Sequence, residues 1–66
     1  MNSEREAQKE YYVLREMIVE LENDIVKFAN GNNTAGTRIR KTMQDVKNAA
    51  QRIRIAVQEE KNAMAQ

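Results

Sequence analysis

A cluster of basic side chains in the second half of the sequence has the clearest potential for chemistry. Six basic residues and one acidic residue lie between positions 38 and 54, and three of the six crowd into positions 38–41. At the start of a helix they would join free backbone N–H groups and a positive helix dipole, a combination that binds anions such as phosphate. Two nearby threonine hydroxyls can donate further hydrogen bonds to phosphate oxygens. The candidate contact residues are Thr34, Thr37, Arg38, Arg40, Lys41, Lys47, Arg52 and Arg54.

Catalysis is not indicated by the other reactive side chains. The sequence has no His and no Cys, which removes the commonest general base, the commonest metal ligands and a thiol nucleophile. Tyr11 and Tyr12 are the only phenols, and neither has a neighbouring base in the sequence. A metal site built from Glu20 and Asp24 would lack softer ligands. We therefore expect no enzyme activity, no cofactor, no metal and no small-molecule substrate.

Two long amphipathic helices are expected to position the basic residues. Apolar residues recur at alternating steps of three and four in both halves, which is the spacing of one helix face. The expected fold is all-α, with a helix over 4–30, a turn at 31–32 and a helix over 33–63, and the whole chain 1–66 forms one antiparallel hairpin. The residues expected to form the core are Tyr11, Leu14, Ile18, Leu21, Ile25, Phe28, Ile39, Met43, Val46, Ala50, Ile53 and Val57.

Residues that favour helix ends and turns support these boundaries. Positions 3–6 match a Ser-x-x-Glu capping box, and Gly31 suits the left-handed conformation that follows a helix end. Asn32 is expected to cap the second helix, with Thr34 as an alternative that would lengthen the loop. Gly36 costs about 1 kcal/mol in a helix interior relative to Ala. It would either keep the surface bare for a close approach by a nucleic-acid backbone or belong to a flexible loop.

The apolar stripes are broader than a two-stranded seam requires. A lone two-helix hairpin has a poor core, and a chain without cysteine has no disulfide to reinforce it. A homodimer that forms a four-helix bundle is the economical solution, although a higher oligomer or a docking partner would also cover the stripes. No apolar run approaches the ~18 residues of a membrane span, and residues 1–6 do not resemble a signal peptide. We therefore expect a soluble cytoplasmic protein without a membrane partner.

Charge is divided unevenly between the two halves. Residues 1–30 contain seven acidic and four basic residues, whereas residues 31–66 contain seven basic and three acidic residues. The basic start of the second helix and the acidic pair Glu59 and Glu60 near its end both oppose the helix dipole. Local conflicts of this kind often mark a functional site.

A helical wheel sorts the basic residues of the second helix into two groups. One strip recurs every seven residues beside the apolar stripe, and it can either pair with acids such as Glu22 or bind a polyanion. The strip consists of Arg40, Lys47, Arg54 and Lys61. The wheel places the other group on the opposite, solvent-facing side. That group consists of Arg38, Lys41 and Arg52.

Residues 31–61 resemble the small chlamydial linker-histone-like proteins and their Bacteroidetes relatives. The resemblance rests on the segment GN-x-x-A-G-T-R-x-R-K that opens the second helix, and it covers about half of the chain. The matching residues are Gly31, Asn32, Ala35, Gly36, Thr37, Arg38, Arg40 and Lys41. The resemblance implies a nucleoid-associated protein that binds and compacts double-stranded DNA with little sequence preference. Thr37, Arg38, Arg40 and Lys41 would then contact the DNA backbone, while Gly31, Asn32 and Gly36 would shape the turn.

The leading hypothesis is therefore a histone-like architectural protein of the nucleoid that acts as a homodimer or higher homo-oligomer. It would bind the phosphates of DNA through the turn and the start of the second helix. Chlamydial members of the resembled family also carry a Lys/Ala/Pro-rich tail that these 66 residues lack, so weak, salt-sensitive binding is expected. The alternatives are a Rop-like hairpin dimer that binds RNA and a purely structural coiled-coil assembly module.

Overall fold

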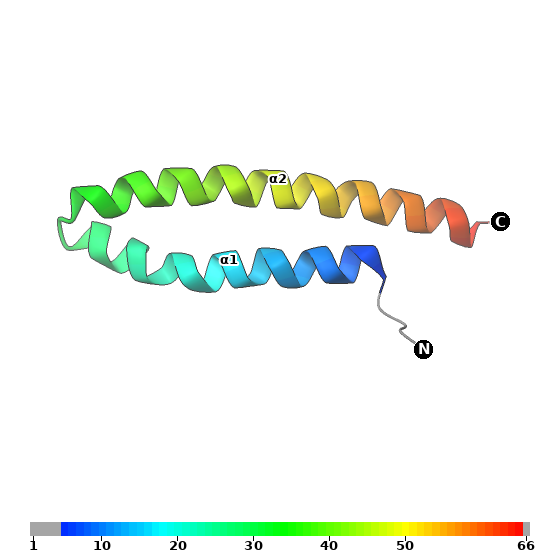
Figure 1. Ribbon diagram of the computed structural model, residues 1–66, viewed down its shortest axis with the longest axis horizontal. Coiled ribbons are helices and arrows are strands. Elements are labelled where there is room, and N and C mark those ends of the chain that lie inside the picture. Colours follow the sequence, from blue (N-terminus) through cyan, green and yellow to red (C-terminus); the bar gives the residue numbers. More distant parts are fainter. Residues whose placement is uncertain (1–4, 66) are drawn as a thin grey trace.

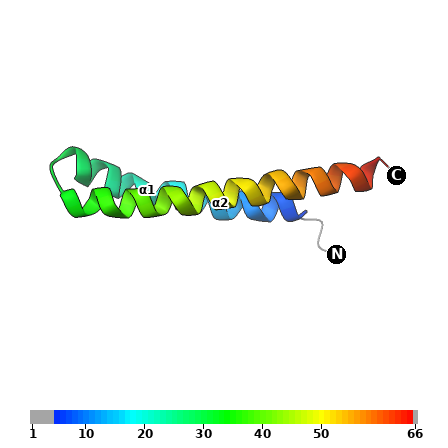
Figure 2. The ribbon, with the colours of Figure 1, turned by 90° about the horizontal axis from the view of Figure 1, so that it is seen from above.

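The computed structural model describes residues 5–65 and contains two helices joined by a tight turn (Figure 1). Helix α1 spans Glu6–Ala29 and helix α2 spans Asn33–Met64. The helices lie side by side and antiparallel, so the first turns of α1 lie beside the last third of α2 (Figure 2). No strand occurs in residues 5–65. The expected all-α hairpin is thereby confirmed.

The turn between the helices has the geometry that its residue types favour. Gly31 adopts φ +99°, a left-handed conformation that side chains with a Cβ rarely take. The backbone N–H of Gly31 donates to the carbonyl of Phe28 at 3.0 Å, and that of Asn32 donates to the carbonyl of Lys27 at 2.9 Å. These two bonds form a Schellman motif, which satisfies the last carbonyls of α1.

Asn32 caps α2, as expected. Its side-chain Oδ1 accepts a hydrogen bond from the backbone N–H of Ala35 at 3.0 Å. Thr34, the alternative cap, lies inside the first turn of α2. The chain thus reverses direction through Asn30, Gly31 and Asn32 alone, and α2 begins directly after the turn.

The helix bounds differ slightly from those expected. We expected helices over 4–30 and 33–63, whereas α1 begins at Glu6 and ends at Ala29 and α2 ends at Met64. The predicted capping box depends on Ser3, which lies outside the described residues. Arg5 occupies the N-cap position of α1, and its side chain makes no capping hydrogen bond.

The start of α1 is capped from the other helix instead. The backbone N–H of Ala7 donates a hydrogen bond of 2.8 Å to Oε2 of Glu60. In an antiparallel hairpin the end of α2 lies beside the start of α1, so the Glu60 carboxylate meets the positive end of the α1 dipole. An acidic residue that opposes the dipole of its own helix therefore favours that of its neighbour.

Small residues on α2 bring the two helices close together. Ala35, Ala49 and Ala56 are 0, 0 and 5% exposed, and the buried large residue on α1 is Leu21, at 7%. The three alanines are spaced by multiples of seven residues, so they lie on one face of α2. Because alanine side chains are short, the helix axes can approach closely along this seam.

Gly36 has a packing role in the same region. It lies inside α2, and a Cβ added there would lie 2.7 Å from Cε1 of Phe28. The ring of Phe28 therefore covers the bare backbone of Gly36 and closes the seam at the turn end. This position is not part of a flexible loop, and packing accounts for its glycine without any reference to DNA.

The hairpin alone buries one of the twelve residues that we expected in an oligomer core, Leu21. Five are half-buried, namely Leu14, Ile39, Val46, Ala50 and Ile53. Six remain exposed, namely Tyr11, Ile18, Ile25, Phe28, Met43 and Val57. Each helix can cover only part of the apolar face of the other. Some residues of each apolar stripe therefore lie in the seam between the helices, and the others lie on the outer surface of the hairpin.

Candidate nucleic-acid interface

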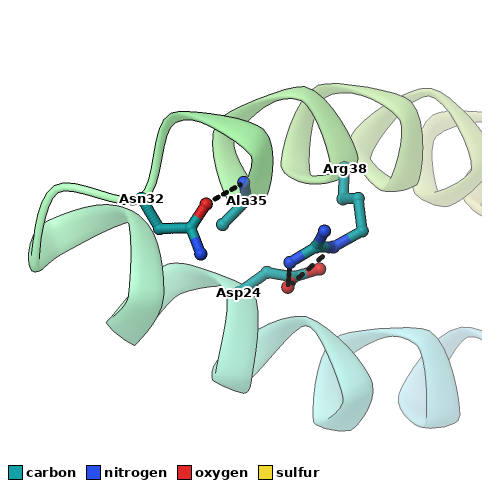
Figure 3. Close-up of polar contacts among 4 residues, drawn as sticks. All are labelled: Asp24, Asn32, Ala35 and Arg38. Carbon is teal, nitrogen blue, oxygen red and sulfur yellow. Dashed lines mark hydrogen bonds and ion pairs between the residues drawn. The ribbon is translucent and has the colours of Figure 1, made fainter.

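Arg38, one of the predicted phosphate contacts, forms an ion pair within the hairpin. Its Nε and Nη2 donate hydrogen bonds of 3.0 and 2.8 Å to Oδ1 of Asp24 on α1 (Figure 3). The prediction that Arg38 lies on a solvent-facing side away from α1 is therefore wrong. Near the turn the end of α1 lies beside the start of α2, so Asp24 is within reach of Arg38. The Arg38 side chain nevertheless stays 46% exposed, against 18% for Asp24.

Both members of this ion pair have perturbed pKa values. The hydrogen bonds from Arg38, and then its charge and that of Lys27, hold the pKa of the Asp24 carboxyl below its ordinary value, while partial desolvation opposes them. The same hydrogen bonds and the Asp24 charge raise the pKa of Arg38. The pair is therefore fully ionised near neutral pH and joins the two helices close to the turn.

Arg52 forms a second ion pair of the same kind farther along the hairpin. Its Nε donates a hydrogen bond of 3.0 Å to Oε1 of Glu10 on α1. The expectation that Arg52 faces solvent away from α1 is wrong for the same reason as for Arg38. Sequence reasoning missed Asp24, Glu10 and Glu60 as structural residues. The antiparallel register, once fixed at the turn, would have been the signal that pairs them with α2.

Arg40 and Lys41 leave the start of α2 positively charged toward water. Nζ of Lys41 lies 3.3 Å from Oδ2 of Asp45 four residues on, but the Lys41 side chain is 79% exposed, so this contact contributes little. Arg40 is exposed and makes no ion pair within residues 5–65. Thr34 and Thr37 are also exposed, so their hydroxyls lie on the same accessible end of the molecule.

Arg40, Lys47, Arg54 and Lys61 form a second accessible group, which we term the basic strip. All four are exposed, and none makes an ion pair within the described part of the chain. Nη1 of Arg54 donates a hydrogen bond of 3.3 Å to Oε1 of Gln51. At 1.5 Å rise per residue the basic strip extends about 32 Å along α2. Pairing of this strip with Glu22 was one of two alternatives, and no such pair forms within the described residues of one hairpin.

Two further features of the helices are their hydropathy and the arrangement of their acidic residues. Neither helix of the described chain is long and apolar enough to cross a membrane. The considered metal pair of Glu20 and Asp24 is not joined by a third acidic ligand, and across residues 5–65 no group of three such ligands occurs. Asp24 is instead engaged by Arg38.

The fold and its surface define a small helical hairpin whose second helix presents more cations than the hairpin neutralises. A model of the histone H1-like protein Hc1 family matches residues 8–63, which include the turn and most of both helices. The chain therefore belongs to this family, whose histone-like character is that of DNA-binding chromatin proteins. No curated protein and no solved structure matches the chain.

Proposed function

We propose that this protein is a nucleoid-associated, sequence-nonspecific DNA-binding protein that acts as a homodimer. It contacts the phosphate backbone of double-stranded DNA through the turn and the start of α2. Membership of the histone H1-like family supports DNA binding in general. We term the turn and the first turns of α2, up to Lys41, the tip of the hairpin. The observation that carries the mechanism is the set of exposed, unpaired cations on α2, which begins with Arg40 at this tip.

Binding proceeds by neutralising phosphates and releasing their counterions. Arg40 and Lys41 supply charge at the tip, Thr34 and Thr37 supply hydroxyl donors, and Arg38 shares its guanidinium with Asp24. If each tip neutralises about three phosphates, the logarithm of affinity falls with the logarithm of salt with a slope near −3 per tip. Contacts to phosphates carry no sequence information, so specificity is low.

Paired alanine substitutions test this mechanism. Arg40→Ala with Lys41→Ala removes two tip charges and should reduce the steepness of the salt dependence by about 2 per tip. Arg5→Ala with Lys9→Ala removes the same charge from exposed positions at the end of the hairpin opposite the turn and is the matched control. The measurement is fluorescence anisotropy of a labelled duplex at several salt concentrations, with circular dichroism to verify helicity. Equal losses in the two variants would contradict a site at the tip.

The two ion pairs between helices favour one competing function, a purely structural assembly module. Arg38 and Arg52 are two of the seven basic residues of α2, and both join α2 to α1. If the remaining cations serve only solubility, duplex DNA will show no salt-dependent affinity. Competition by structured RNA in the same assay distinguishes an RNA-binding hairpin, which would prefer the RNA.

A further inference from the structure

One face of the hairpin is apolar and uncovered. Leu21 on α1 and Ala49 on α2 mark the direction of the seam on each helix. At about 100° of rotation per residue, three further residues on each helix lie within about 80° of that direction, all turned in the same rotational sense about their own helix axis. Because the helices are antiparallel and face each other, the same sense of rotation leads to the same face of the hairpin. This apolar face consists of Tyr11, Ile18, Ile25, Val46, Ile53 and Val57. Tyr11, Ile18 and Ile25 are 46 to 49% exposed, although they are large apolar residues.

The opposite face of the hairpin carries the ion pairs. Glu10 and Asp24 lie on the other side of the seam in α1, and Arg52 and Arg38 lie on the other side in α2. Their hydrogen bonds of 2.8 to 3.0 Å show independently that these sides of the two helices coincide. The hairpin therefore has two different faces. One carries the ion pairs between the helices, with Val13 exposed beside them, and the other offers the larger uncovered apolar surface.

The extent of the exposed surface fits one more copy of this chain. The hairpin has 5401 Å² of accessible surface, whereas a compact monomer of 7.7 kDa has about 4,300 Å². Along the 24 residues of α1, this side of the hairpin measures about 36 Å by about 20 Å, or about 700 Å², and the apolar face occupies its centre. A stable pair buries about 800 Å² on each partner. A second copy laid face to face therefore buries what a stable dimer requires.

Charge on α1 selects the orientation of the second copy. Arg15 and Glu22 are exposed, border the apolar face and make no ion pair within residues 5–65. We consider a two-fold axis that is perpendicular to the helices and passes between Ile18 and Val19. This axis brings Arg15 of each copy level with Glu22 of the other copy, so two such pairs form. The tips then point in opposite directions. With the tips at the same end, the hairpin register would place Arg15 level with the partner's Lys47, where like charges repel, and Glu22 level with the partner's Arg40, where opposite charges attract. The two effects would offset each other, so α1 gains charge pairing only in the antiparallel arrangement.

We propose, building on the DNA-binding function above, that two copies pack antiparallel through this apolar face and merge their basic strips into one DNA-binding surface. The same axis lays α2 beside α2 of the partner subunit, which brings Met43 level with the partner's Val46. The strip borders this contact, since Ile53 and Val57 share a surface hollow with Arg54 and Lys61. Eight cations then follow a line of about 50 Å, the length of about 15 base pairs. The like charges of the two strips repel each other where the strips meet, although water and salt screen this repulsion, and bound phosphates would neutralise it.

Charge reversal tests the orientation without DNA. Arg15→Glu alone should weaken the antiparallel dimer, in which it opposes the partner's Glu22, whereas it would strengthen a dimer with the tips at the same end, in which it faces the partner's Lys47. Glu22→Arg opposes Arg15 with a like charge at two places and should weaken dimerisation at least about tenfold, as measured by analytical ultracentrifugation. Arg15→Glu combined with Glu22→Arg restores both pairs and should recover the wild-type dissociation constant. The two positions are seven residues apart on α1, so rescue has to arise between copies. A double variant as weak as the single one, or a monomeric wild type, overturns the proposal.

A cysteine near the axis gives an independent measure of the orientation. The wild-type chain has no cysteine, so Ile18→Cys can oxidise only with its own copy in a partner. We expect a covalent dimer on oxidation, whereas Thr34→Cys, at the tips, should remain uncrosslinked. Crosslinking at Thr34→Cys in place of Ile18→Cys would mean that the tips meet, which overturns the antiparallel arrangement.

The merged surface is tested with duplex DNA. Lys47→Ala with Lys61→Ala removes four cations per dimer far from the turn and should reduce the salt slope by about 3 to 4 per dimer. Arg5→Ala with Lys9→Ala is the matched control, away from both the turn and the basic strip, and should leave the slope unchanged. An unchanged slope in the strip variant, with wild-type binding intact, refutes the merged surface. Absence of DNA binding by the wild type refutes the proposed function instead. The charge-reversal and crosslinking experiments do not use DNA, so they still test the dimer in that case.

Discussion

Replacing Asp24 with Asn tests whether Arg38 can serve the DNA site as well as the hairpin. The substitution keeps the size of the side chain but removes the charge that Arg38 contacts through Nε and Nη2 at 3.0 and 2.8 Å. Arg38 is already 46% exposed and lies between Thr37 and Arg40 at the start of α2, so its guanidinium needs only a rotation to face a phosphate. The formal net charge of the chain rises from +1 by one unit.

The magnitude follows from the number of phosphates contacted. One additional contact per copy makes the slope of log affinity against log salt more negative by about 0.9. Between 50 and 200 mM salt, affinity for DNA should therefore fall about three- to fourfold more than in the wild type. At low salt Asp24→Asn should bind more tightly than the wild type. Adding Arg38→Ala to Asp24→Asn should abolish the gain, because no guanidinium remains to make the new contact.

The assay is anisotropy of a labelled duplex over a salt series, with helicity recorded by circular dichroism. Glu20→Gln is the matched control, since it removes one exposed carboxylate from α1 that makes no ion pair among the described residues. If Asp24→Asn and Glu20→Gln change the slope equally, the effect reports net charge and not the release of Arg38. If the slope of Asp24→Asn equals that of the wild type while the protein stays folded, Arg38 does not contact phosphate and serves only to join the two helices.

Three further predictions concern stability. Asn32→Ala should lower the free energy of unfolding by about 1 kcal/mol, because it removes the acceptor for the Ala35 N–H, whereas Thr34→Ala should be close to neutral; urea titrations compare them. Gly36→Ala should raise the free energy of unfolding by less than the helix propensity of alanine suggests, because the Phe28 ring has to move. In a Phe28→Ala background the same substitution should raise the free energy of unfolding by about 1 kcal/mol. The pKa of Asp24 is lowered from its ordinary 3.8 in the folded chain. The contribution of Asp24 to the free energy of unfolding is therefore complete above pH 3.8 and is lost as the pH falls through the lower pKa of the folded state. The thermal midpoint should therefore drop in that acidic range, and less so in Arg38→Ala.

The hairpin could be predicted because its signals are local. Helix periodicity, Gly31 after a helix end and Asn32 before the next helix each depend on a few neighbouring residues, and all agree with the structure. The start of α1 was not predictable in the same way, because the side chain that caps it is Glu60, which is 53 residues away from Ala7 in the sequence. No local pattern reports a contact of that separation.

The interface could be predicted only in part, for a related reason. Which cations occur on α2 is evident from the sequence, but which of them are neutralised depends on the register between helices. Arg38 and Arg52 meet Asp24 and Glu10 across the seam, whereas Arg40 meets no acid within residues 5–65. The apolar stripes presented the same difficulty, since a wheel of one helix does not separate the side chains that meet the other helix from those that face outward.

The charges at the ends of the helices illustrate how the antiparallel arrangement resolves a conflict that one helix cannot. The basic start of α2 lies beside the last third of α1, where Arg38 meets Asp24, and the last third of α2 lies beside the start of α1, where Glu60 accepts from the backbone N–H of Ala7. Each group opposes the dipole of its own helix and stabilises the hairpin across the seam. Part of the charge pattern is therefore structural. What remains after this pairing is the basic strip with Lys41 at the tip, and it is this unneutralised remainder, not the total charge of α2, that is available to phosphates.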